Sequence, residues 1–323
     1  MSETILELRG VSKRFPLRGF ASFGKSVHAM DDVGFALARG ESLALVGESG
    51  SGKTTTASVI AGLHEPTSGT IFLGGVPARP PRSRAESLAR KKKVQMIFQD
   101  PFGSLNPTHT IRSILDRPFL IHGLARRGPE LERKLEACLE QVGLSPAAEY
   151  LRRFPHELSG GQRQRVNIAR TFAAEPEIVL ADEPTSMLDV SIRMGVMNMM
   201  LDLKEARGVS YLYITHDLAG ARYMCSRLAV MYAGMIMEIG PTEAVISKAS
   251  HPYVRLLKAA SPAPEAGAAR EKIGSSGEIP SLIDPPAGCR FHTRCPYAKS
   301  ECSASVPALR DLGGGHLVRC VLY

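Results

Sequence analysis

The stretch Gly47-Glu48-Ser49-Gly50-Ser51-Gly52-Lys53-Thr54 constrains this 323-residue chain more than any other part of it. It fits G-x-x-x-x-G-K-[ST], the pattern of a phosphate-binding P-loop. The apolar run 42–46 before it predicts a buried parallel strand, and residues 55–61 after it predict a helix. The glycines let backbone N–H groups face phosphate oxygens, Lys53 has the reach for the β- and γ-phosphates, and the Thr54 hydroxyl suits Mg²⁺. We therefore expect a nucleoside triphosphate to bind here.

The composition is that of a globular chain with a sizeable core, because 44% of the residues are hydrophobic. The first residues show no basic region followed by an apolar one, and no run of 18 apolar residues follows, so we expect neither a secretory signal nor a membrane span. A net charge of +8 is compatible with nucleic acid or an anionic membrane surface. The densest basic segment, 79–93, has no interleaved aromatic residues to stack bases, so we expect a solvated surface and no nucleic acid.

Strands and helices alternate along the chain. Strands are predicted at 5–8 (as an edge strand), 70–73, 94–98, 178–181 and 211–215, and helices at 85–93 and 194–203. The methionines of the last helix are interpreted as core packing. Residues 111 to about 174 are helical in pattern, with an apolar stripe of Leu131, Leu135, Cys138, Leu139 and Val142. The order predicts an α/β fold with a largely parallel sheet, a helical insertion, and a linker after Ala260.

Further polar residues follow the predicted strands. Asp182 and Glu183 end an apolar strand, where two carboxylates are costly without a cation, so Asp182 suits Mg²⁺ and Glu183 suits activation of a water. His216 ends another strand, at the edge of the sheet where ligands bind, and a γ-phosphate contact and a structural role remain equally open. Gln99 can bond the metal or the water, but a single glutamine after a strand is weak evidence for such a role.

A second glycine-rich stretch, Ser159-Gly160-Gly161-Gln162, opens a predicted helix and provides a second anion-binding helix end. One triphosphate needs only one such cradle, so this one is interpreted as serving a neighbouring subunit.

Taken together, these motifs resemble those of the ATP-binding-cassette (ABC) ATPases over residues 3 to 258. The order and spacing of that family are followed by the P-loop, Gln99, Ser159–Gln162, Asp182-Glu183, Asp189 and His216. The segments 98–107, 153–157 and 251–253 further resemble the oligopeptide/dipeptide/nickel importer subfamily.

The resemblance implies a P-loop NTPase cassette with a RecA-like core, a β-subdomain and a helical insertion, plus a small Cys-rich C-terminal extension. The implied boundaries are a cassette over 1–258, with its helical subdomain at about 100–174, a linker over 259–288 and the cysteine motif over 289–323. In that family two cassettes dimerise head to tail and sandwich two ATP molecules.

The resemblance also implies a role for each motif residue. Phe15 stacks on adenine, and the nucleotide is held by Gly47, Glu48, Ser49, Gly50, Ser51, Gly52, Lys53, Thr54 and Thr55. Mg²⁺ is held by Thr54, Gln99 and Asp182. Glu183 is the general base, His216 contacts the γ-phosphate, and Gln99 also links the site to the membrane subunits. The partner's ATP is reached by Ser159, Gly160, Gly161 and Gln162, and Asp189 lies at the dimer interface.

Two positions depart from the family pattern. Phe15 stands where tyrosine is commoner, which keeps the stacking ring, and Met187 stands where a small residue is usual, which alters packing at the interface but removes no catalytic group. Every catalytic position is filled, so a competent ATPase is expected.

Four of the six cysteines, Cys289, Cys295, Cys302 and Cys320, fall in the last 35 residues. Four thiolates suit Zn²⁺ or an iron–sulfur cluster, and the missing C-x-x-C pairs disfavour zinc. Similar peptide-importer ATPases carry a four-cysteine motif associated with a [4Fe–4S] cluster, so a cluster is expected, with zinc or unligated thiols as alternatives. Cys138 and Cys225 are interpreted as buried small hydrophobes.

The leading hypothesis is the energy-coupling ATPase of an ABC importer for peptides or a related small solute, peripheral on the cytoplasmic face of the membrane. Its expected partners are a second cassette, as a homologue rather than a copy of itself, two transmembrane permease subunits and, indirectly, an extracytoplasmic solute-binding protein. The alternative is a soluble ABC ATPase acting in translation or DNA repair, which usually has two cassettes in one chain or a long coiled coil. A non-catalytic regulatory module is disfavoured by Glu183 and His216.

Overall fold

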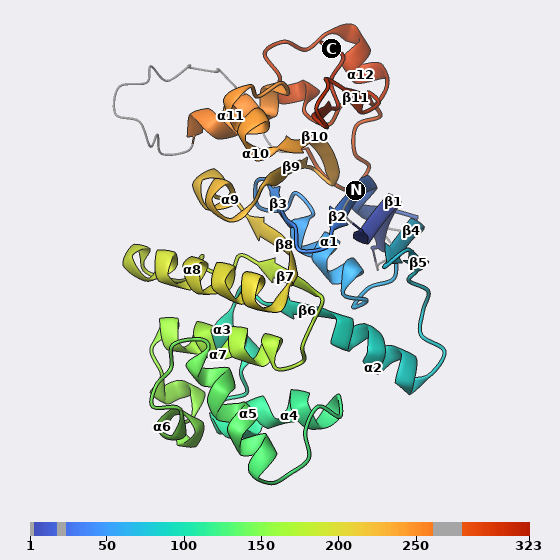
Figure 1. Cartoon of the computed structure of the whole chain (residues 1–323). Coiled ribbons are helices and arrows are strands. Elements are labelled where there is room, and N and C mark those ends of the chain that lie inside the picture. Colours follow the sequence, from blue (N-terminus) through green and yellow to red (C-terminus); the bar gives the residue numbers. More distant parts are fainter. Residues whose placement is uncertain (1–2, 18–23, 261–279) are drawn as a thin grey trace. The chain divides into compact units, whose positions relative to one another are not determined.

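The computed structural model describes residues 3–17, 24–260 and 280–323. The chain forms two compact units, one of residues 1–78 together with 213–323, the other of residues 79–212 (Figure 1). Strand β8 (Ser210–Thr215) carries the chain from the second unit into the first. Much of the predicted linker, residues 261–279, lies outside the described residues.

The first unit contains a four-stranded antiparallel sheet in the order β2-β1-β4-β5. Its strands are β1 (Thr4–Pro16), β2 (Ser26–Ala38), β4 (Ser68–Leu73) and β5 (Val76–Pro77). The prediction of an edge strand at residues 5–8 is wrong, because Leu8 pairs with Phe35 on one side and with Ile71 on the other. Ile5, Leu6 and Leu8 are buried, which a strand paired on both sides allows. This sheet is the β-subdomain that the resemblance implied.

A second set of strands in the first unit follows the order β11-β12-β10-β9-β3. The strands are β3 (Ser42–Val46), β9 (Arg227–Tyr232), β10 (Met235–Pro241), β11 (Arg310–Asp311) and β12 (Leu317–Val318). Only β3 and β9 are parallel, and the other pairs are antiparallel, so the predicted largely parallel sheet is correct only in part. Val318 of the C-terminal segment pairs with Glu238 of β10, so the tail extends the sheet of this unit.

The helices of the first unit are short. They are α1 (Lys53–Ile60), α9 (Leu218–Met224), α10 (Thr242–Ser247), α11 (Pro252–Ala260), the 3₁₀ turn η3 (His292–Arg294) and α12 (Ser300–Ala304). β3 is buried throughout and leads through the P-loop into α1, as the sequence predicted. Leu282, in the described second part of the predicted linker, contacts β2, since the N–H of His28 donates to its carbonyl over 2.8 Å.

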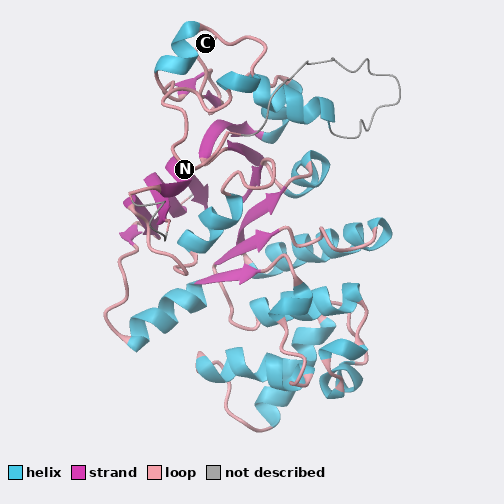
Figure 2. Cartoon of the chain, turned by 180° about the vertical axis from the view of Figure 1, so that it is seen from behind, coloured by secondary structure: helices cyan, strands magenta, loops and turns pink. Residues whose placement is uncertain are grey.

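The second unit contains two parallel strands, β6 (Val94–Ile97) and β7 (Ile178–Asp182), with helices around them (Figure 2). Its helices are α2 (Arg84–Lys93), α3 (Pro101–Ser104), α4 (Ile111–Ile121), α5 (Pro129–Glu140), α6 (Ala147–Arg152), the 3₁₀ turn η2 (Pro155–Glu157), α7 (Gly160–Phe172) and α8 (Val190–Arg207). The predicted apolar stripe of α5 is buried from Leu131 to Val142, which confirms the helical insertion. Met197, Met199 and Met200 of α8 are buried, as expected for core residues. The core interpretation is wrong for Met194, which is 45% exposed because it lies in the solvent-facing first part of α8.

Candidate functional site

The P-loop connects β3 to α1, and two of its positions, Gly47 and Gly52, have room only for glycine. A Cβ on Gly47 would lie 2.1 Å from the carbonyl oxygen of Met231, and one on Gly52 would lie 2.3 Å from that of Ala29. Gly52 also has a φ of 102°, which side chains rarely adopt. Lys53 is buried, and its Nζ donates to the carbonyl oxygens of Gly47 and Glu48 over 2.8 Å each. The ammonium therefore lies inside the loop, while Thr54 at the start of α1 is exposed.

Residues from far along the chain support this loop. The N–H of Glu48 donates to the hydroxyl of Tyr253 over 2.9 Å, and the N–H of Gly234 donates to the carbonyl of Ser51 over 2.9 Å. Tyr253 is fully buried and packs against Tyr232, with ring centroids 4.5 Å apart. The segment 251–253, which the sequence marked only as a subfamily feature, thus fixes the backbone of the P-loop.

Phe15, the predicted adenine-stacking residue, lies at the end of β1 in the first unit. Its half-buried ring meets the ring of His64 edge-on, with centroids 5.2 Å apart, and the Lys13 ammonium lies 4.9 Å from its centroid. His216, the predicted γ-phosphate contact, follows β8 directly and is exposed.

The second unit brings two predicted residues together. Asp182 is the last residue of β7 and is 3% exposed, and Glu183 follows with a left-handed backbone of φ 45°. Gln99, two residues beyond β6, donates from Nε2 to a carboxylate oxygen of Glu183 over 3.1 Å. Left-handed backbone is strained for a residue other than glycine, and such strain is concentrated at functional sites. The parallel strands β6 and β7 thus place the amide beside the carboxylate.

Ser159, Gly160, Gly161 and Gln162 form the beginning of α7. Ser159 is the N-cap, and it exchanges hydrogen bonds with Gln162 in a capping box: Gln162 N–H to Ser159 Oγ over 3.3 Å and Ser159 N–H to Gln162 Oε1 over 3.0 Å. Ser159 is exposed, so this helix end is open to an anion. Gly161 is buried against Ile192, which a Cβ would approach to 3.1 Å.

The four tail cysteines line one pocket of the first unit, together with His251 and Phe291. Cys302 accepts the N–H of Lys299 at 3.4 Å, and the backbone N–H groups of Phe291, Tyr297 and Leu322 act to lower the pKa of Cys289, Cys295 and Cys320 respectively. Burial raises the pKa of Cys289 to about 11, against the effect of the Phe291 N–H. In the described ranges 3–17, 24–260 and 280–323, no group of three or more His, Cys, Asp or Glu side chains has a metal-holding arrangement. The structure thus gathers the cysteines without forming a ready single-ion site.

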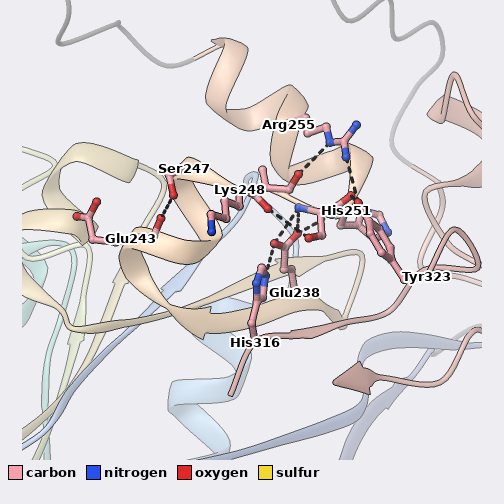
Figure 3. A network of polar contacts seen from close by, with 10 residues as sticks. Glu238, Glu243, Ser247, Lys248, His251, Arg255, His316 and Tyr323 are labelled. Atoms are coloured by element: carbon pink, nitrogen blue, oxygen red, sulfur yellow. Dashed lines mark hydrogen bonds and ion pairs between the residues drawn. The ribbon is translucent and has the colours of Figure 1, made fainter. Parts of the chain in front are cut away.

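A buried carboxylate anchors the tail to β10 (Figure 3). Glu238 is fully buried, and it accepts the N–H groups of Ser250 at 3.0 Å and of His251 at 2.6 Å. Nε2 of His316, which belongs to the tail, lies 2.7 Å from the same carboxylate. Burial raises the pKa of Glu238 despite these hydrogen bonds. Glu238 thus joins the tail to the segment that leads into α11, and hence to Tyr253 behind the P-loop.

His251 makes the stability of this region depend on pH. It is 1% exposed, and burial, with the charge of Arg255, lowers its pKa from 6.5 to about 3. As the pH falls below 6.5 the unfolded chain binds a proton at this residue while the folded chain does not, so stability present at pH 7 is lost toward pH 3. We expect a loss of about 2 kcal/mol between pH 7 and pH 5 through His251.

Urea unfolding at both pH values, of the native chain and of His251→Gln, measures this loss. Glu238 is present in both proteins, and its raised pKa changes stability with pH in the opposite direction. The difference between the two pH dependences therefore measures the contribution of His251 alone. Equal pH dependence in the two proteins would contradict a buried neutral His251.

Several site residues were not identified from the sequence. Tyr253 and Gly234 support the P-loop although they lie 205 and about 180 residues further along the chain than the loop residues they contact. The arginines of the tail belong to no motif. The one sequence feature that could have pointed to these arginines is that each stands beside a tail cysteine, in Cys289-Arg290, Arg294-Cys295 and Arg319-Cys320.

Among the described residues, no helix combines the length and the apolar character needed to cross a membrane. The model of the ABC transporter family matches residues 30–186, and that of the oligopeptide/dipeptide transporter C-terminal region matches residues 237–302. The chain is 43% identical to the oligopeptide transport ATP-binding protein AppF of Bacillus subtilis, over 99% of this chain and 98% of that protein. It is 41% identical to the dipeptide transport ATP-binding protein DppF of Haemophilus influenzae, over 98% of this chain and 96% of that protein.

Solved structures agree with these relatives. A dimeric ATP-binding cassette in a post-hydrolysis state, bound to ADP and Pi, matches with a TM-score of 0.64 and 27% identity, over 74% of this chain and 99% of that one. The cassette fold is therefore established by both sequence and structure. The chain belongs to the ABC transporter ATP-binding proteins, in their oligopeptide/dipeptide branch.

Proposed function

We propose that the chain is the ATP-hydrolysing subunit of an importer for peptides or a related small solute, peripheral on the cytoplasmic face of the membrane. The carrying observation is the match along nearly the whole length, tail included, to AppF and DppF, which are named for oligopeptide and dipeptide transport. The intact set of catalytic residues supports hydrolysis rather than nucleotide binding alone.

In the proposed reaction, the P-loop N–H groups and Lys53 bind the phosphates of ATP, and Phe15 stacks on the adenine. Mg²⁺, when bound by Thr54, Asp182 and Gln99, neutralises charge on the β- and γ-phosphates. Asp182 suits this role because it is a buried carboxylate at the end of a strand.

Glu183 is proposed to orient the attacking water and accept its proton, while Gln99 fixes the Glu183 carboxylate through the 3.1 Å hydrogen bond. His216 is proposed to contact the γ-phosphate.

The proposed working form is a dimer of cassettes, in which Ser159, Gly160, Gly161 and Gln162 bind the ATP of the partner. The exposed N-cap of α7 supports this role. Met187 and Val190, next to Asp189, are exposed apolar residues at 54% and 77%, as expected for residues that a partner covers. We propose that the partner is a homologous cassette, and that the pair drives two permease subunits fed by an extracytoplasmic solute-binding protein.

We also propose that Cys289, Cys295, Cys302 and Cys320 hold a [4Fe–4S] cluster, which would stabilise the tail. Two observations support it: the four thiols line one pocket, and backbone N–H groups face the sulfurs, since Cys302 accepts that of Lys299 and neighbouring N–H groups favour the thiolate at the other three. Hydrogen bonds to the sulfurs tune cluster ligands. Zinc and unligated thiols remain the competing assignments.

Anaerobic purification tests the cluster. We expect iron and acid-labile sulfide at about four atoms each per chain, and a loss of most of both in Cys302→Ala. Cys225→Ala, which changes a buried cysteine outside the pocket, is the matched control and should keep the iron. Zinc instead of iron in the native chain would replace the cluster by a zinc site, and absence of both would leave free thiols.

Solute uptake tests the proposed function. In the source organism, deletion of the gene should abolish uptake of a labelled di- or oligopeptide, and the native gene should restore it while Glu183→Gln should not. Nickel, glutathione, opine-like and sugar solutes are measured in parallel. Unchanged uptake of all of them after deletion would contradict the importer proposal.

A further inference from the structure

Three arginines of the tail stand beside cysteines of the pocket and contact the cassette. Arg290 follows Cys289, Arg294 precedes Cys295, and Arg319 precedes Cys320. Their side chains are 4%, 12% and 6% exposed, and they pair with Asp31, Glu48 and Asp32 respectively. The cysteines line their pocket while the neighbouring arginines bind the cassette, so short segments of the tail make both contacts.

One of these arginines reaches the P-loop itself. Arg294, at the end of η3, donates from one terminal nitrogen to both carboxylate oxygens of Glu48, at 3.0 and 3.3 Å, and to the hydroxyl of Tyr232 at 3.3 Å. Its guanidinium lies 5.7 Å from the ring centroid of Tyr232 and 5.8 Å from that of Phe291. The Arg294 side chain is therefore held by two aromatic residues and fixed on a P-loop carboxylate.

Arg290 reaches the same loop through one intermediate. It donates to the carbonyl of Ala233 and pairs with Asp31. The next residue, Gly234, donates its N–H to the carbonyl of Ser51 in the P-loop. Arg290, two residues before η3, and Arg294, the last residue of η3, thus both act on the P-loop.

The charge of Glu48 explains why such a contact matters. Glu48 is the second residue of a loop whose ligand is a polyanion, and its side chain is only 25% exposed, so solvent screens it weakly. An uncompensated carboxylate there opposes phosphate binding. A guanidinium on both of its oxygens cancels the charge and fixes the side chain on Arg294.

We propose that Arg294 is a positioning residue for ATP binding: the tail neutralises and holds Glu48, so that the P-loop presents only its N–H groups and Lys53 to the phosphates. The proposal rests on the assignment of the P-loop to ATP. In this proposal the cysteine-rich tail contributes to nucleotide binding.

Binding of a non-hydrolysable ATP analogue with Mg²⁺ to the purified full-length chain, by calorimetry, tests it. We expect Arg294→Gln to raise the dissociation constant about tenfold, because Glu48 is then left uncompensated. Arg294→Lys keeps the charge but loses the planar guanidinium that contacts both Glu48 oxygens and lies near two rings, so its dissociation constant should fall between those of the native chain and Arg294→Gln. Glu48→Gln keeps the backbone N–H of this loop residue and removes only its negative charge, so Arg294 is left uncompensated and the analogue should bind more tightly than to the native chain. Arg294→Gln/Glu48→Gln should return to within about twofold of the native value.

Arg319→Gln is the matched control, since Arg319 is also a buried tail arginine beside a cysteine but donates to Asp32, Ile236 and Pro307 rather than to a P-loop residue. It should lower thermal stability, because the carbonyls of Ile236 and Pro307 lose a donor, and leave analogue affinity within about twofold. An unchanged affinity in Arg294→Gln, or a double variant as weak as Arg294→Gln alone, would overturn the proposal. If Arg294→Gln does not fold, weaker binding by Glu48→Gln than by the native chain would overturn it equally.

The variant Lys53→Ala distinguishes failure of this proposal from failure of the assignment of the P-loop to ATP. If Lys53→Ala binds the analogue with native affinity, the P-loop is not the ATP site. Loss of binding there, together with an unchanged affinity in Arg294→Gln, would refute only the role of Arg294.

Discussion

Replacing Glu183 by glutamine is expected to slow ATP hydrolysis about 1,000-fold while ATP still binds. The amide keeps the shape of the side chain and the neighbourhood of Gln99, 3.1 Å away, but it accepts no proton from the attacking water. Binding should persist because the P-loop, including Lys53, is unchanged. The measurement is phosphate release at saturating ATP, alongside binding of the non-hydrolysable analogue.

Glu205→Gln is the matched control for this change. Glu205 lies on the exposed side of α8 in the same unit, and the substitution removes the same charge. Its hydrolysis rate should equal that of the native chain. Hydrolysis by Glu183→Gln at the native rate would exclude Glu183 as the general base.

Truncation of Phe291 to alanine is expected to lower the free energy of unfolding by about 3–5 kcal/mol. Phe291 is fully buried, and its ring lies 5.3 Å from that of Tyr232 and 5.4 Å from that of Tyr253. Removing it opens a cavity between the tail and the residues that support the P-loop. Urea unfolding measures the loss, and faster proteolysis of the tail should accompany it.

Tyr297→Ala provides the comparison within the same tail. Tyr297 is 43% exposed, so its removal should change stability by less than about 1 kcal/mol. A loss below 1 kcal/mol for Phe291→Ala as well would contradict the packing of the tail on Tyr232 and Tyr253.

The parts of the fold that follow from local pattern were predictable. β3, the P-loop and α1 combine an apolar run, a glycine pattern and a helix within 20 residues, and β7 and α8 are similarly plain in the sequence. The edge-strand prediction for residues 5–8 failed because pairing of β1 on both sides depends on β2 and β4, which lie later in the chain. The hairpin of β9 and β10 was missed although two apolar runs flank Ala233-Gly234 there, a usual hairpin signal.

The motif residues of the candidate site were likewise visible from the sequence, because a phosphate cradle requires fixed residue types at fixed spacing. The tail contacts were not. Arg294 and Glu48 are separated by 246 residues, and Glu238 and His316 by 78, so only the folded chain brings them together. An arginine or a glutamate in isolation indicates nothing about such a partner.

The central claim is that this chain energises membrane permeases, and co-purification tests it most directly. Tagged full-length protein is expressed in its source organism and recovered from solubilised membranes without oxygen, and the bound chains are identified by mass spectrometry. The account predicts two multi-spanning subunits and a second, homologous cassette in comparable amounts. Recovery of ribosomal or DNA-repair proteins, with no multi-spanning subunit, would contradict it and favour a soluble ABC ATPase.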